Sequence, residues 1–222
     1  MAKELLAFCP PQASLYTGRM AFSGETTIDG LSAVAKAVPD AAALLPAPAW
    51  MHAIVYGCTS GTIVLGQDKV AELIHRSRPG VPVVTPIGAV LKAFRALRLA
   101  RVAVVTPYVT EVNRLVARTI HEAGVEIVNA RTFGQRDADE MFLTPAEAFL
   151  EAALAADSPD ADGIFISCTG ISVSPIVREL ERRTGKPVVT SNQAIAWQCR
   201  EIAGVAETEN DLGALFGHRL PD

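Results

Sequence analysis

The sequence predicts an α/β protein of two similar flavodoxin-like lobes. Each lobe is expected to be a parallel sheet with helices on both faces, and the active site is expected in the cleft between the lobes. Two observations predict this fold. Short runs rich in Val, Ile and Ala alternate with helix-length segments along the whole chain, which is typical of parallel sheets covered on both faces. Several short motifs also occur twice, once in each half of the chain.

The predicted elements follow from hydrophobic runs and their periodicity. The strands are expected at 5–8, 53–56, 81–84, 102–105, 125–129, 164–167 and 188–190. The helices are expected at 30–45, 66–77, 87–97, 109–123, 145–156, 174–184 and 193–203. The helix at 109–123 is a clear case, because Val112, Val116 and Ile120 repeat at helical spacing with charged residues between them.

The repeated motifs indicate where the two lobes divide. The pairs are 82–85 with 187–190, 7–10 with 104–107, and Cys58-Thr59 with Cys168-Thr169. We expect a first lobe at 1–98 and a second at 99–204, with the tail 205–222 packing back on the first. Ligands bind beyond the carboxyl ends of strands in such sheets. Because the matched motifs lie at those ends, a cleft between the lobes would gather them.

The composition excludes several function classes. Half of the 222 residues are apolar, a fifth are charged, and the net charge is −4, which gives no sign of a nucleic acid or membrane partner. No apolar run approaches the roughly 20 residues that span a bilayer, and Met1–Glu4 shows no signal-peptide pattern. We therefore expect a cytoplasmic protein with reduced thiols. Its cysteines have no CxxC spacing, so no metal site is expected.

Two segments that follow predicted strands carry the most chemical information. They are Gly57-Cys58-Thr59-Ser60-Gly61-Thr62 and Ser167-Cys168-Thr169-Gly170-Ile171-Ser172. Each leads toward a predicted helix, whose N-terminal N–H groups and dipole can hold a carboxylate and lower the pKa of a thiol. Two such sites at matching places predict a pair of cysteines, Cys58 and Cys168, that face each other across the cleft.

Each of these residues also has a structural interpretation. A single free cysteine is more often a buried small hydrophobe than a catalyst, and we expect this of Cys9 and Cys199. Thr59, Ser60, Thr169 and Gly170 could be ordinary turn or cap residues. Their functional alternative is a set of hydroxyl and N–H groups that hold a carboxylate as it becomes an enediolate. Tyr108 could reach a ligand or pack as a half-buried aromatic residue.

The motifs together resemble the aspartate/glutamate racemase superfamily, and within it the maleate cis-trans isomerases and arylmalonate decarboxylases. The residues that carry the likeness are 9–11, 57–60, 106–113, 162–170, 186–191 and 196–197. The resemblance implies a cofactor-free enzyme that acts on a small carboxylate or dicarboxylate, with a homodimer common in the family. In the racemases two cysteines flank the α-carbon of the substrate, and in the maleate isomerases the first-lobe cysteine adds to the double bond. In the decarboxylases a glycine replaces that first cysteine, and the second cysteine protonates an enediolate.

The resemblance implies a role for each candidate residue. Cys58 would act as thiolate and Cys168 as the acid or base across the substrate. The residues that would bind the carboxylate are Thr59, Ser60, Tyr108, Thr169 and Gly170. Pro11 and Gln12 would form the floor of the cleft. This chain keeps both cysteines, like the isomerases and racemases, but its segments 10–13 and 106–108 are nearer the decarboxylases. We therefore expect an isomerase or racemase, with a decarboxylase that uses Cys168 alone and a non-catalytic carboxylate-binding protein as alternatives.

Overall fold

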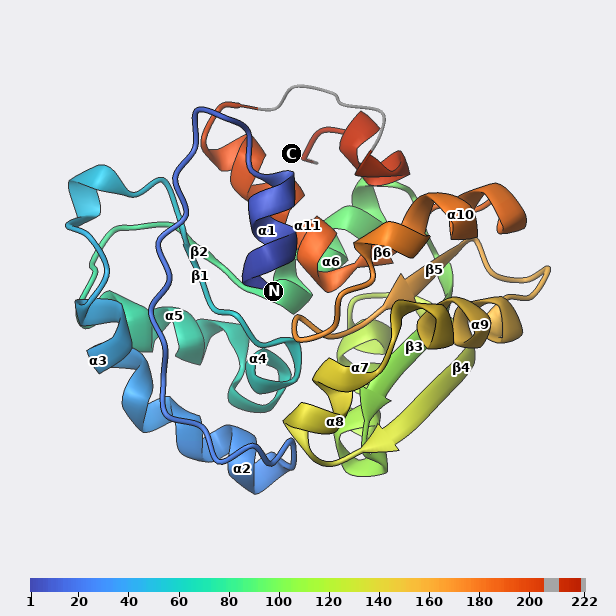
Figure 1. The fold of residues 1–222 in the computed structure, drawn as a ribbon, viewed down its shortest axis with the longest axis horizontal. Helices are drawn as coiled ribbons and strands as arrows, with labels where there is room; N and C mark the ends of the chain where they lie inside the picture. The colour runs from blue at the N-terminus through green and yellow to red at the C-terminus, as the bar shows by residue number, and fades with distance from the viewer. Residues whose placement is uncertain (206–211, 221–222) are drawn as a thin grey trace.

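The computed structural model describes residues 1–205 and 212–220 and confirms the α/β fold (Figure 1). The helical elements are α1 (Ala2–Phe8), α2 (Ile28–Ala33), η1 (Val34–Ala37), α3 (Val38–Ala43), η2 (Pro48–Trp50), α4 (Thr59–Leu65), α5 (Gln67–His75), α6 (Pro86–Ala96), α7 (Thr110–Glu122), α8 (Ala138–Leu143), α9 (Ala146–Ala156), α10 (Ser174–Thr184), α11 (Ser191–Ile202) and η4 (Ala214–Gly217). The strands are β1 (Ile54–Val55), β2 (Val83–Val84), β3 (Arg101–Tyr108), β4 (Glu126–Gln135), β5 (Gly163–Ile166) and β6 (Val188–Thr190).

The strands form two parallel sheets, one from each half of the chain. β1 pairs with β2, and the larger sheet has the order β4-β3-β5-β6. The register of the larger sheet sets Val102 opposite Gly163 and Ile166 opposite Thr190. The carboxyl ends of β3, β5 and β6 therefore lie side by side, which brings the segments that follow them to one edge.

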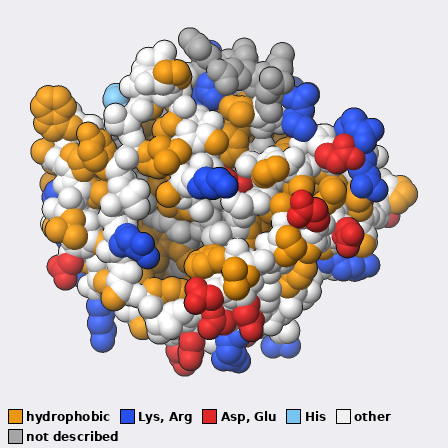
Figure 2. Space-filling view, viewed as in Figure 1, with side chains coloured by type: hydrophobic (Ala, Val, Ile, Leu, Met, Phe, Trp, Pro, Cys, Tyr) orange, Lys and Arg blue, Asp and Glu red, His pale blue; other side chains and the backbone are white. Residues whose placement is uncertain are grey.

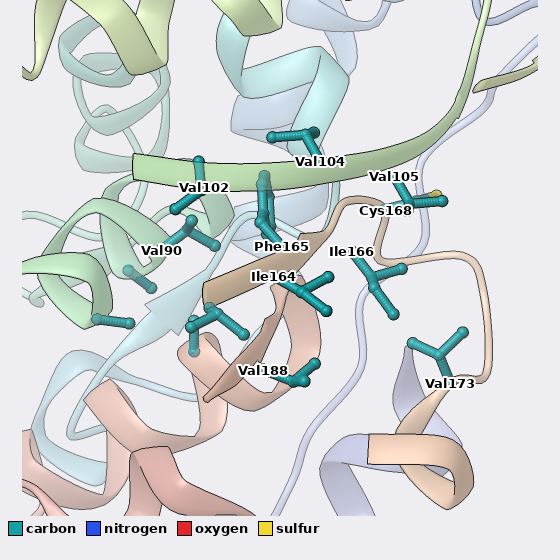
Figure 3. Packing of buried hydrophobic residues seen from close by; sticks show 14 of the residues in the cluster. Val90, Val102, Val104, Val105, Ile164, Phe165, Ile166, Cys168, Val173 and Val188 are labelled. Carbon is teal, nitrogen blue, oxygen red and sulfur yellow. The ribbon is translucent and has the colours of Figure 1, made fainter. Parts of the chain in front are cut away.

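The core is built on the two central strands of the larger sheet. All residues of β5 are buried, as are all of β3 after Arg101. Figure 3 shows Val102 and Val104 of β3 beside Ile164 and Phe165 of β5, with Cys168 at the far end of the same packed cluster. Such continuous apolar runs are expected of a parallel strand that is covered on both faces.

Helices cover both faces of this sheet. α9 contacts β3 and β4 and packs against α10, and α7 contacts β4 and β3. Right-handed crossovers from β3 to β4 and from β4 to β5 run in opposite directions along the sheet, so they place α7 and α9 on opposite faces. α7 turns Val112, Val116 and Ile120 inward, as its periodicity predicts.

The prediction of a strand at 5–8 was wrong, because these residues lie in α1. All of the first six residues of α1 are Ala, Lys, Glu or Leu, which are strong helix formers. Leu5 and Phe8, three residues apart, share its buried face. Cys9 therefore ends a helix, and the likeness of 7–10 to 104–107 is not one of structure.

Other differences concern the short helices and the tail. α4 and α8 were not predicted, and the helix expected at 30–45 is divided into α2, η1 and α3. Of the tail, residues 206–211 and 221–222 lie outside the described residues. Its described part touches both halves of the chain: Phe216 packs on Phe8, while η4 contacts α11 and β6. Within the described ranges, no helix is long and apolar enough to cross a membrane. The lobe boundary at residue 98 stays a proposal, because one core cluster includes Phe94 as well as β3.

Candidate active site

A hollow in the surface lies over α4, beside α8 and the segment that leads from α1 to α2 (Figures 1 and 2). Cys58 precedes the first residue of α4 and is partly exposed. Cys168 follows β5 and is almost buried, with 9% of its surface exposed. The two thiols are close enough for the charge of Cys58 to raise the pKa of Cys168.

The first cysteine is placed by the junction of β1 and α4. Cys58 has extended backbone angles and is the N-cap residue of the helix, and its Sγ accepts the N–H of Gly61 at 3.2 Å. The hydroxyl of Thr62 donates to the Cys58 carbonyl at 2.7 Å. Thr, Ser and Gly are poor helix formers, so these capping bonds and burial stabilise the first turn. The sulfur lies where an anion would be favoured.

The second cysteine lies in a loop between β5 and α10. Its Sγ accepts the N–H of Gly170 at 3.3 Å. Cys168 has a φ of 139°, which an L-residue adopts only at a cost of about 1–3 kcal/mol. Such a conformation persists only when the surroundings hold it in place, and it is found often at functional sites.

Hydrogen bonds join the two cysteine segments directly. The hydroxyl of Thr169 donates to the carbonyl of Gly57 at 2.7 Å. The hydroxyl of Thr59 donates to Ser191 at 3.0 Å, and the same Ser191 oxygen accepts the N–H of Cys168 at 3.2 Å. Thus the carboxyl ends of β1, β5 and β6 meet at one polar centre, as the matched motifs predict.

Tyr108 lies at the same centre, at the end of β3. Its hydroxyl is 3.2 Å from the hydroxyl of Ser167, and only 1% of its surface is exposed. Burial raises the pKa of Tyr108 well above its ordinary value, and the charges of Cys168 and Cys58 add to this. The carboxamide of Asn113 donates to the Tyr108 carbonyl at 2.8 Å. Tyr108 is therefore a fixed, neutral donor that faces both thiols.

The expectation that the helix N-terminus lowers the pKa of the thiols was wrong for this structure. Burial raises the pKa of Cys58, and it raises the pKa of Cys168 to about 11. The N–H groups of Gly61 and Gly170 do act in the opposite direction, but the loss of solvent outweighs them. Both sulfurs are therefore protonated at neutral pH.

The structure brings most of the predicted site residues together, but not all. Thr59, Ser60 and Thr169 are buried beside the cysteines, and Gly170 packs against the ring of Phe142, with which a Cβ at this position would collide. Pro11 and Gln12 are exposed in a turn after α1, and no described contact joins them to the cysteines. Instead the side chain of Met1 lies against Gly57.

Sequence reasoning missed two residues that contact the centre. Ser191 and Asn192 begin α11 and are buried. The repeat of 82–85 as 187–190 marked the end of β6 as a ligand-facing edge, but it gave no reason to assign a role to the polar residues that follow. Among the described residues, no group of three or more His, Cys, Asp or Glu side chains lies together as metal ligands would.

Comparisons with known proteins agree with this geometry. A family described as arylmalonate decarboxylase matches residues 9–216. The arylmalonate decarboxylase of Bordetella bronchiseptica is 32% identical over 198 residues, which cover 87% of this chain and 82% of that protein. The maleate isomerase of Nocardia farcinica is 30% identical over 152 residues, which cover 65% of this chain and 61% of that protein.

The solved structures belong to the same two kinds of enzyme. A liganded variant of arylmalonate decarboxylase, with one glycine changed to cysteine and one cysteine to serine, matches with a TM-score of 0.78 at 30% identity, covering 87% of this chain and 84% of that one. A variant of the N. farcinica maleate cis-trans isomerase matches with a TM-score of 0.84 at 25% identity, covering 96% and 90% of the two chains. That isomerase variant carries a covalently bound succinylcysteine intermediate.

Proposed function

The chain belongs to the arylmalonate decarboxylase family, and we propose that it is a cofactor-independent isomerase or racemase. Its substrate is a small carboxylate or dicarboxylate, and Cys58 and Cys168 carry the reaction. The observation that carries this proposal is the hydrogen bond from Thr169 to the Gly57 carbonyl. This bond sets the two cysteine segments against each other, and Ser191 joins them a second time.

The proposed reaction begins on the Cys58 side. In cis-trans isomerisation the Cys58 thiolate forms an S–C bond with one alkene carbon, and the electron pair of the double bond moves onto the adjacent carboxylate as an enediolate. Cys168 gives this enediolate a proton at its carbon, so that the former double bond can rotate as a single bond. Cys168 then takes the proton back, and the returning electron pair re-forms the double bond and expels the Cys58 thiolate. In racemisation Cys58 instead takes the α-proton, and Cys168 donates a proton to the opposite face of the enediolate. Neither path changes an oxidation state. Isomerisation returns Cys58 as the thiolate and Cys168 as the thiol, whereas racemisation leaves Cys58 protonated and Cys168 as the thiolate, so protons must exchange with solvent before the next turnover in the same direction.

The main catalytic requirement is to stabilise the second negative charge of the enediolate. The residues proposed for this are Thr59, Ser60, Tyr108, Thr169 and Gly170. Tyr108 is suited to it, because its raised pKa keeps the hydroxyl protonated as a donor. Loss of one such donor typically costs about 10²–10³ in rate.

The test is incubation of the purified protein in deuterium oxide with maleate, fumarate, aspartate, glutamate, 2-arylpropionates and arylmalonates, followed by proton NMR. We expect interconversion of an alkene pair, or entry of deuterium at an α-carbon with loss of optical purity. The Cys58→Ala variant is expected to show neither. Loss of carbon dioxide from an arylmalonate alone would overturn the two-thiol proposal, and so would no change in any compound.

A decarboxylase is the second candidate, and the match to the arylmalonate decarboxylase family over residues 9–216 favours it. In that reaction a disubstituted malonate loses carbon dioxide, its electron pair forms an enediolate, and the Cys168 thiol protonates one face. Cys58 then has no role. This candidate predicts that Cys58→Gly keeps or improves the release of carbon dioxide.

A further inference from the structure

Two buried polar residues at the start of α11 have no part in the reaction described above. Ser191 contacts both cysteine segments, and Asn192 contacts the Cys168 segment. Ser191 is fully buried and Asn192 is 1% exposed. Buried polar side chains cost free energy unless they are hydrogen-bonded. Their partners therefore indicate why these residue types occupy the two positions.

The hydroxyl oxygen of Ser191 contacts one residue from each segment. It accepts the N–H of Cys168 at 3.2 Å and the hydroxyl of Thr59 at 3.0 Å. Both bonds span long separations in sequence, and both are buried. A shift of the Cys168 loop would therefore move Ser191 and, through it, disturb the hydrogen bond of Thr59, the first residue of α4.

Asn192 holds the remainder of the Cys168 loop. Its amide nitrogen donates to the carbonyl of Thr169 at 3.2 Å and to that of Ile171 at 3.4 Å. The same nitrogen donates to Glu4 Oε2 at 2.6 Å, and Glu4 Oε1 accepts the N–H of Ser174 at 2.6 Å. Glu4 thus connects Asn192 to the first residue of α10, at the other end of the loop.

The Cys168 loop needs such support, because its conformation is unfavourable without it. Cys168 has a φ of 139°, and the residues between β5 and α10 belong to no helix or strand. An alternative explanation is that Ser191 only caps α11. That role belongs to Thr190, whose hydroxyl accepts the N–H of Gln193 at 3.1 Å. Ser191 is therefore not the cap of α11, and its hydroxyl instead bonds to both cysteine segments.

We propose that Ser191 and Asn192 are positioning residues that hold Cys168 in its left-handed conformation, and that Ser191 couples this conformation to the Cys58 half of the site. The proposal rests on the proposed function, in which Cys168 must point at the substrate. Neither residue touches the reacting atoms. Their effect on the rate comes through the placement of the Cys168 sulfur, where an error of about 1 Å can cost about 100-fold.

The test compares Ser191→Ala with a matched control, Thr190→Val. Both variants remove one buried hydroxyl from the start of α11, but Thr190 has no hydrogen bond to either cysteine segment. The first measurement is the exchange rate of the Cys168 amide proton by NMR, together with Tm for each variant. We expect Ser191→Ala to speed this exchange at least about tenfold, and Thr190→Val to leave it within about twofold at a similar Tm.

The second measurement separates kcat from KM on the substrate identified by the deuterium experiment. We expect Ser191→Ala to lower kcat by about 10- to 100-fold with KM changed less than about threefold, and Thr190→Val to change neither by more than about threefold. If Ser191→Ala does not fold, Ser191→Cys tests the same contact, because a thiol of similar size is a weaker acceptor. It is expected to move both measurements in the same direction by a smaller factor.

The outcomes distinguish this proposal from the proposed function. An unchanged Cys168 amide in the folded Ser191→Ala variant would overturn the positioning role, whatever the enzyme does. Equal effects of Ser191→Ala and Thr190→Val would also overturn it, since they would indicate a general role in α11. A selectively faster exchange without turnover on any compound would support the positioning role while the proposed function fails.

Discussion

The two cysteine segments share a sequence pattern but differ in structure. Cys58 precedes α4 directly, has ordinary extended backbone angles and is partly exposed. Cys168 lies in a loop with a φ of 139° and is 9% exposed. Each sulfur nevertheless accepts a backbone N–H from a glycine two or three residues ahead. The difference therefore lies in the backbone conformation that holds each sulfur and in how much of each residue is exposed.

This difference indicates a division of labour between the halves. Cys58 is the more exposed residue of the two, so it is the better candidate to lose its proton and attack a substrate. The enclosed thiol, with a pKa of about 11, is the better candidate to keep a proton and donate it. We accordingly assign the nucleophile or base to Cys58 and the proton donor to Cys168.

The largest expected effect comes from removing each sulfur in turn. We expect Cys168→Ala to lower kcat/KM by at least about 10³-fold for isomerisation and for decarboxylation, because both need a proton at that position. Cys58→Ala is expected to lower isomerisation or racemisation equally and to leave any decarboxylation within about threefold. Each rate is measured by NMR, and the variant and the unchanged protein are compared on the same substrate.

Cys199→Ala is the matched control for these variants. Cys199 is a partly buried cysteine of α11 that the proposed reaction does not use, so its loss should change kcat/KM less than about twofold. Full activity in Cys168→Ala would contradict the comparison, because Cys168 would then not be the proton donor that we infer.

The pH dependence gives a smaller effect that distinguishes the two reactions. Burial raises the pKa of Cys58, so its thiolate fraction is small at neutral pH and grows about tenfold per pH unit. We expect kcat/KM for isomerisation to rise about 100-fold from pH 6.5 to 8.5. It should fall only as Cys168, with a pKa of about 11, loses the proton it must donate.

A decarboxylase that uses the Cys168 thiol alone predicts the opposite shape. Its active form is the protonated thiol, which is fully populated below the pKa of about 11. The rate should therefore be flat from pH 6.5 to 8.5. A flat profile for isomerisation would contradict our assignment of Cys58 as the thiolate, and the measurement needs only initial rates in overlapping buffers.

The sequence could predict the larger sheet and the meeting of the two motifs, because both follow from apolar runs and from strand ends in a parallel sheet. α1 was predicted wrongly, because Leu5–Phe8 is apolar enough to suit either a strand or a helix, whereas the strong helix formers from Ala2 to Ala7 favour the helix. The direction of the thiol pKa shifts was missed for a different reason. Helix polarity can be read from local sequence, whereas burial depends on the whole fold.

The smallest expected effect concerns how fast Cys58 and Cys168 are alkylated in the absence of substrate. Iodoacetamide is neutral and reacts with the thiolate, so its rate depends on solvent access and thiolate fraction together. Because Cys58 is partly exposed and Cys168 is 9% exposed, we expect Cys58 to be alkylated about tenfold faster at pH 8, as measured by mass spectrometry of the two peptides. Malonate should slow the reaction of Cys58 if a small carboxylate occupies the hollow over α4. Equal alkylation rates for the two cysteines would contradict a difference in their exposure to solvent. The separate roles of Cys58 and Cys168 would then lack this support.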